Sequence, residues 1–127
     1  MSFTLIDQGS EGFELHANVW TWKAVVEIIR SFDILGEGEL RQMSYNATGV
    51  KLPVEQAHEI GERIRKEILP RVAPDKRMFA DLTVTEAPDD MTLYRDGDEQ
   101  WKNYSVSYEW LKEFSDFCAR SKGFQVF

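Results

Sequence analysis

The sequence has few cysteines that could form disulfides and few long apolar runs that could anchor a protein in a membrane. Cys118 is the single cysteine among 127 residues, which excludes an intramolecular disulfide and favours a reducing compartment. No segment approaches the roughly 18 consecutive apolar residues of a membrane-spanning helix. The first seven residues, MSFTLID, contain neither a basic region nor an apolar run of signal-peptide length. We therefore expect a cytoplasmic protein with no membrane partner.

Positive charge is also in short supply. The chain has 22 acidic and 15 basic residues and a formal net charge of −7. A net negative charge repels polyanions, so we expect no nucleic-acid partner. The largest excess of acid lies in residues 79–127, which carry 10 acidic and 5 basic residues, and the stretch 86–99 is the most acidic of the chain. Such a stretch is either a solvated loop or a docking surface for a basic partner.

The remaining composition is that of an ordinary globular protein. Hydrophobic residues make up 43% and charged residues 29% of the chain. A chain of this length can bury enough apolar surface for a core without metal or disulfide staples. We therefore expect a single globular domain over residues 1–127.

Apolar residues at helical spacing predict three principal helices. The first spans about 19–34, with Asn18 as N-cap and Gly36 as the stop signal. The second spans about 54–69, between Pro53, which is favourable in a first turn, and Pro70, which is expected to end the helix. Gly61 lies on the apolar stripe of that helix, which indicates a close crossing with another element. The third helix spans about 107–120 and has Ser107 as a plausible cap.

Weaker signals predict a minor antiparallel β component. Residues 3–6 and 13–16 are expected to form one hairpin. Residues 92–94 and 101–106 flank Asp96-Gly97, a common turn pair, and predict a second hairpin. The predicted fold class is thus helix-dominated α+β, and an all-α fold is the alternative.

One fragment has the form of a metal site. His58 and Glu62 are four residues apart on the second helix, so both could ligate Zn²⁺ while Glu59 polarises a water. A metallopeptidase helix of this kind would need a second histidine as a metal ligand, and the only other histidine of the chain is His16. This fragment leaves a small metal-dependent hydrolase as the alternative function.

Other catalytic signals are missing from the sequence. Cys118 lies near the C-terminal end of the third helix, where the helix dipole disfavours a thiolate, so we expect a buried core residue. There is no nucleophile elbow, phosphate-binding glycine loop or dinucleotide fingerprint, and we expect no cofactor. The segment 114–124 resembles the C-terminal ends of some small bacterial proteins, and that resemblance implies no activity.

Aromatic residues are the most distinctive feature. Trp20 and Trp22 are two positions apart on one predicted helix, so they point to different faces, and Trp22 belongs to the apolar stripe. Trp101 and Tyr104 lie beside the acidic stretch. Because tryptophan is enriched at binding hot spots, the sequence predicts a partner-binding surface there. Its members are Trp101, Tyr104, Asp96, Asp98 and Glu99.

Together these features predict a small acidic protein-interaction or regulatory module of the immunity or accessory type, with no evident enzymatic activity. We expect the partner to be another protein. A homodimer stays open as an alternative, since helices with broad apolar faces can leave surface uncovered.

Overall fold

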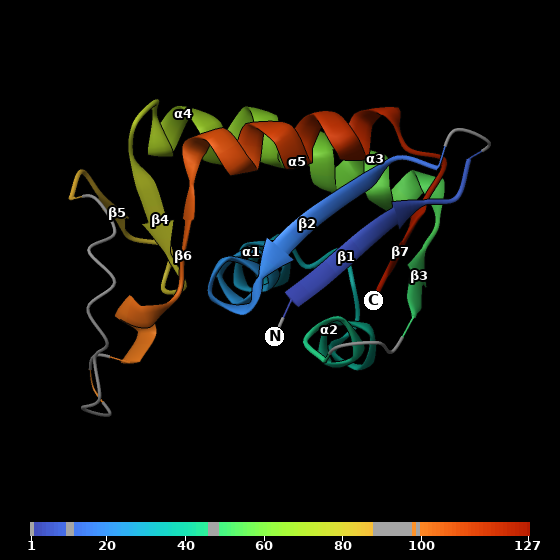
Figure 1. Cartoon of the computed structure of the whole chain (residues 1–127). Coiled ribbons are helices and arrows are strands. Elements are labelled where there is room, and N and C mark those ends of the chain that lie inside the picture. The colour runs from blue at the N-terminus through green and yellow to red at the C-terminus, as the bar shows by residue number, and fades with distance from the viewer. Residues whose placement is uncertain (1, 10–11, 46–48, 88–97, 99) are drawn as a thin grey trace.

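The computed structural model describes residues 2–9, 12–45, 49–87, 98 and 100–127. Within these residues the chain forms helices and two antiparallel sheets (Figure 1), which confirms the α+β class and excludes the all-α alternative. None of the helices in this part of the chain is both long and apolar enough to cross a bilayer. The elements follow in the order β1 (Ser2–Asp7), β2 (Glu14–Asn18), α1 (Val19–Phe32), α2 (Glu37–Met43), β3 (Val50–Leu52), α3 (Val54–Arg63), a π-helical turn (Ile64–Ile68), α4 (Leu69–Val72), β4 (Arg77–Phe79), β5 (Val84–Thr85), a 3-10 helix (Gln100–Asn103), β6 (Ser105–Ser107), α5 (Tyr108–Arg120) and β7 (Phe124–Val126).

The larger sheet has the strand order β2-β1-β7-β3 and is antiparallel throughout. The predicted N-terminal hairpin is confirmed, with Phe3 opposite Ala17 and Leu5 opposite Leu15. Alternate residues of β1 are buried, as expected for a strand with one face on the core. β7 is inserted between β1 and β3, so residues near the C-terminus lie in the interior of this sheet.

The smaller sheet has the order β5-β4-β6, and its strands are only two or three residues long. The prediction of a strand over 101–106 is wrong in its first half, where residues 100–103 form a 3-10 helix. The following strand β6 pairs with β4, and Met78 lies opposite Val106. The proposed partner strand 92–94 and its Asp96-Gly97 turn lie outside the described residues.

Helix α1 begins as predicted and ends earlier than predicted. The side chain of Asn18 accepts a hydrogen bond from the Thr21 amide at 2.8 Å, which is the expected N-cap. The helix ends at Phe32, because Asp33 adopts the left-handed conformation that Asp tolerates better than most residues. Gly36, predicted as the stop, instead precedes the first residue of α2, a helix that the sequence did not reveal.

The second predicted helix continues through Pro70, so the prediction that this proline ends it is wrong. The amide of Leu69 donates to the carbonyl of Ile64, five residues back instead of four. This turn is therefore wider than a regular turn and contains one extra residue. In a regular helix the ring of Pro70 would collide with the carbonyl four residues before it. The wider turn gives the ring room, and the helix runs on to Val72.

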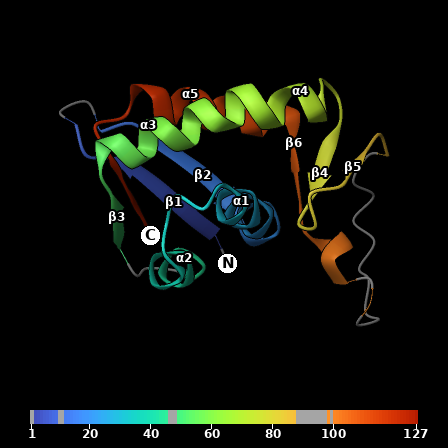
Figure 2. The same ribbon diagram turned by 180° about the vertical axis from the view of Figure 1, so that it is seen from behind.

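Helix α5 matches its prediction, with the Ser107 hydroxyl accepting from the Trp110 amide at 3.1 Å. It lies side by side with α3, as both Figure 1 and Figure 2 show. The crossing depends on Gly61, because a Cβ added there would lie 2.8 Å from the Cβ of Cys118. The Ser115 hydroxyl donates to the carbonyl of Gly61 at 2.9 Å. The predicted close crossing at Gly61 is confirmed.

Aromatic rings fill the space between α1, α5 and the larger sheet. Trp22 lies at the centre, with ring centroids 5.8 Å from Phe3 and 6.1 Å from Phe114. Its indole N–H donates to the carbonyl of Met43 at 2.7 Å, which ties α2 to this core. The ring of Phe114 also stacks on Trp110 and contacts Phe124 edge-on. The core thus joins the first and last strands of the chain through side chains of α1 and α5.

Candidate functional site: the aromatic groove

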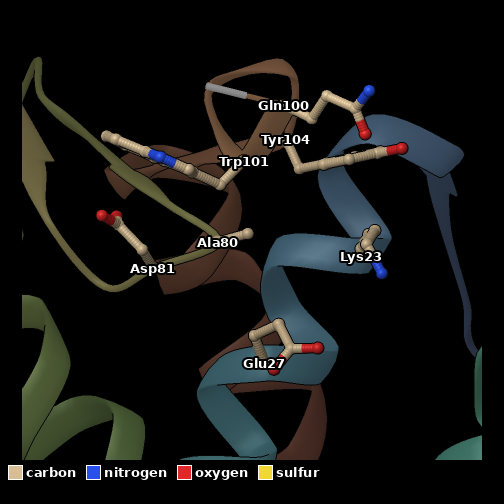
Figure 3. Close-up of a pocket in the computed structure, with 7 residues that line it drawn as sticks. All are labelled: Lys23, Glu27, Ala80, Asp81, Gln100, Trp101 and Tyr104. Carbon is tan, nitrogen blue, oxygen red and sulfur yellow. The ribbon is translucent and has the colours of Figure 1, made fainter. Parts of the chain in front are cut away.

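A groove with a volume of about 370 Å³ opens between α1, the residues that follow β4 and the 3-10 helix. We call it the aromatic groove. Its lining residues are Lys23, Glu27, Ala80, Asp81, Gln100, Trp101 and Tyr104 (Figure 3). In that view Trp101 and Asp81 project to one side, and the Tyr104 ring lies above Lys23 on the other.

The wall from α1 is the face that does not enter the core. Lys23 and Glu27 are four residues apart, so they lie on one side of the helix, and Trp20 precedes Lys23 by three. Trp20 is 41% exposed to solvent, whereas Trp22 is 1% exposed. The sequence prediction that these two tryptophans face different ways is confirmed.

Trp101 comes from the 3-10 helix and is held by its surroundings. Its indole N–H donates to the backbone carbonyl of Asp98 at 3.0 Å. Its ring meets Phe79 of β4 edge-on, with centroids 5.2 Å apart. The ammonium of Lys102 lies 5.5 Å from the Trp101 centroid. The ring is therefore fixed while still partly exposed to solvent.

Tyr104 closes the opposite side of the groove. Its ring lies 5.4 Å from that of Trp20, and the Lys23 ammonium lies 5.4 Å from its centroid. Its carbonyl accepts from the Ala80 amide at 3.0 Å. Tyr104 thus links the 3-10 helix to both walls of the groove.

The two carboxylates of the groove have different partners. Glu27 forms a close ion pair with Arg30, and these contacts raise the pKa of the Arg30 guanidinium. Asp81 accepts through Oδ1 alone, from the amide and the hydroxyl of Thr83 at 3.1 and 2.6 Å. Among the described residues no cation pairs with Asp81. The groove therefore holds one oriented carboxylate that no cation within the described ranges balances.

The predicted partner-binding residues are brought together in part. Trp101 and Tyr104 line the same groove, and Asp98 is exposed next to it, with its backbone bonded to Trp101. Asp96 and Glu99 lie outside the described residues. Sequence reasoning missed Glu27 and Asp81.

A signal for one wall was present in the sequence. Trp20, Lys23 and Glu27 recur at spacings of three and four, which marks a second face of the first helix. Nothing in the sequence indicated that Asp81 would line a groove together with residues of that helix, since the small sheet that positions it has no strong strand pattern.

The predicted metal fragment has a different set of contacts. The ring Nε2 of His58 lies 3.0 Å from the carbonyl oxygen of Ser121, so this nitrogen donates its proton there. Glu62 pairs with Arg65 at 2.6 Å and Lys66 at 2.9 Å, and their hydrogen bonds lower its pKa. Within the described residues no three His, Cys, Asp or Glu side chains are grouped as metal ligands, and His16 lies elsewhere, beside Thr4 and Glu14. The metal-dependent hydrolase stays a prediction, and no contact in the described part of the chain favours it.

Cys118 is fully buried in the crossing of α3 and α5. Burial raises the pKa of its thiol well above the ordinary range. A thiol that stays protonated is a poor nucleophile, so the residue acts as a small core side chain.

No protein-family model matches the chain, and neither a curated protein nor a solved structure shows significant similarity to it.

Proposed function

We propose that the protein is an interaction module, of the immunity or accessory type, that binds a protein partner through the aromatic groove. The observation that carries the proposal is the gathering of Trp20, Trp101 and Tyr104. Trp101 and Tyr104 are partly exposed and line the groove, and the exposed ring of Trp20, from a distant segment, packs against Tyr104. Partly exposed tryptophan and tyrosine side chains are the residues that most often dominate binding energy.

The rigidity of these rings supports the proposal. Trp101 is held by a hydrogen bond to the Asp98 carbonyl and by Phe79, and Tyr104 is held between Trp20 and Lys23. A side chain that is already ordered loses little entropy when a partner covers it. A core role would instead favour full burial of such large rings, as seen for Trp22.

The test is affinity capture from an extract of the cells that naturally make the protein. We expect wild-type protein to retain a specific polypeptide, and Trp101→Ala to weaken its binding by more than about 2 kcal/mol, or about 30-fold. Tyr45→Ala is the matched control, because Tyr45 is 61% exposed and lines no part of the groove. Binding that Trp101→Ala leaves unchanged would overturn the proposal.

Thermal unfolding of each variant shows whether the fold is intact. If Trp101→Ala unfolds, Trp20→Ala replaces it as the test, because Trp20 is more exposed than the core rings and contacts Tyr104. Capture that survives Trp20→Ala as well as the control would then count against the groove.

A further inference from the structure

We infer that the aromatic groove binds an arginine side chain of the partner, seated between the Trp101 ring and the Asp81 carboxylate. This inference rests on the proposed function and adds the chemistry of recognition to it. Both residues line the groove and project to the same side of it (Figure 3).

The charge pattern of the groove selects a cation at this end. Lys23 lies at the other end, against Tyr104, and Glu27 is already neutralised by Arg30. Asp81 is therefore the carboxylate that can accept further hydrogen bonds. Thr83 donates to its Oδ1, and among the described residues no group bonds to Oδ2. The bonds from Thr83 also fix the orientation of the carboxylate before a ligand arrives.

The ring beside Asp81 is suited to a cation as well. The electron-rich face of an indole attracts cations more strongly than other aromatic side chains do. Cations already lie over the rings of this region: Lys102 near Trp101, and the Arg77 guanidinium 4.7 Å from the Phe79 centroid. These contacts show that aromatic rings of this region accept cations at their faces.

Arginine fits this pairing better than lysine. A guanidinium is planar, so it can stack on a ring and donate hydrogen bonds to a carboxylate in its own plane. It is also more weakly hydrated than an ammonium, so entry into a partly apolar groove costs less. The net charge of −7 favours the approach of a basic partner over longer distances.

The experiment compares three acetylated and amidated pentapeptides, in which Arg, citrulline or Glu stands between pairs of glycines. Citrulline has the shape of arginine without its charge. Binding is followed through the four tryptophan indole N–H signals in ¹H–¹⁵N spectra, with Trp101 assigned from Trp101→Phe. We expect the arginine peptide to shift the Trp101 signal saturably in the millimolar range, and the citrulline peptide to bind at least about tenfold more weakly.

Asp81→Asn should reduce the affinity for the arginine peptide several-fold and leave citrulline binding unchanged. Asp116→Asn, which removes an exposed carboxylate of α5 outside the groove, should change neither. Equal binding of arginine and citrulline, stronger binding of the glutamate peptide, or no shift of Trp101 at tens of millimolar would overturn the inference.

The proposed function can survive such a failure. If Trp101→Ala still abolishes partner capture, the groove is an interface and only the chemistry assigned to its ligand is wrong. If capture is also unaffected, both proposals fail.

Discussion

The two faces of α1 differ in how completely the rest of the protein covers them. On one face Trp22 is surrounded by Phe3, Trp110 and Phe114, and its N–H is bonded to Met43. On the other, Trp20 contacts only one ring in the described residues, that of Tyr104, and stays partly in solvent. The core face is closed by long strands and helices, whereas the groove face is closed by a sheet of very short strands. The large side chain of Trp20 on the second face thus stays partly in solvent because little else covers it.

The largest expected effect separates the two tryptophans of α1. Trp22→Ala should lower the free energy of unfolding by about 4 kcal/mol, because it leaves a cavity and an unpaired Met43 carbonyl. Trp20→Ala should lower it by no more than about 1 kcal/mol, since it removes one ring contact. Urea denaturation of both variants measures the difference. Similar losses for the two would mean that the groove face belongs to the core.

A smaller effect is expected from two glycines that differ in their surroundings. Gly61→Ala should destabilise the protein by about 1–2 kcal/mol, because the cost of overpacking against Cys118 exceeds the gain in helix propensity. Gly38→Ala in α2, where nothing lies within 4 Å of an added Cβ, should be neutral or stabilising by up to about 1 kcal/mol. The midpoint of thermal unfolding compares them. A stabilising Gly61→Ala would show that α3 and α5 can move apart at little cost.

The buried thiol makes stability depend on pH. Because the pKa of Cys118 is raised in the folded state, the thiol of the unfolded chain ionises first as the pH rises. Stability should be unaffected below the ordinary thiol pKa and should then fall by up to about 1.4 kcal/mol per pH unit above it. Urea denaturation between pH 7 and 10 tests this, with Cys118→Ala as the control that should lose the slope. An identical slope in the control would assign it to another group.

The smallest expected effect concerns the fragment His58–Glu62. His58→Ala should cost about 1 kcal/mol through loss of the hydrogen bond to Ser121. Equimolar zinc should leave the midpoint of thermal unfolding unchanged in both wild type and variant, because Glu62 already pairs with two cations. A zinc-dependent rise that disappears in His58→Ala would instead favour the metal-dependent hydrolase.

These comparisons also show what the sequence could and could not predict. Local signals were sufficient where the chain interacts with itself at short range, as at the Asn18 and Ser107 caps and along the apolar stripes of α1 and α5. They failed at Pro70, where the expected break is avoided by a π-helical turn, and at α2, whose seven residues are too few for a clear period. Neither the π-helical turn nor α2 is marked by the local residue pattern.

The residues of the candidate site also fall into those that the sequence predicted and those that it did not. Aromatic content pointed to Trp101 and Tyr104, but the groove exists only because β6 pairs with β4 and brings the residues after β4 close to α1. Sequence proximity suggested acids at 96–99, of which Asp96 and Glu99 lie outside the described residues, and it did not suggest Asp81, a carboxylate that lines the groove. Long-range strand pairing determines which charge lines the groove, and this short pairing leaves almost no pattern in the sequence.

The position of β7 has a consequence for how the protein is made. Within the described part of the chain β3 pairs only with β7, and the first residue of β3 lies opposite the last residue of β7. At ordinary elongation rates β3 therefore waits on the order of 10 s on the ribosome before its partner strand is synthesised. Until then Val50 and Leu52 form an uncovered edge, and the core around Trp22 lacks Phe124. The larger sheet thus closes only after β7 has been translated, and the interval before that is the period in which its unpaired strands are most exposed to misassembly.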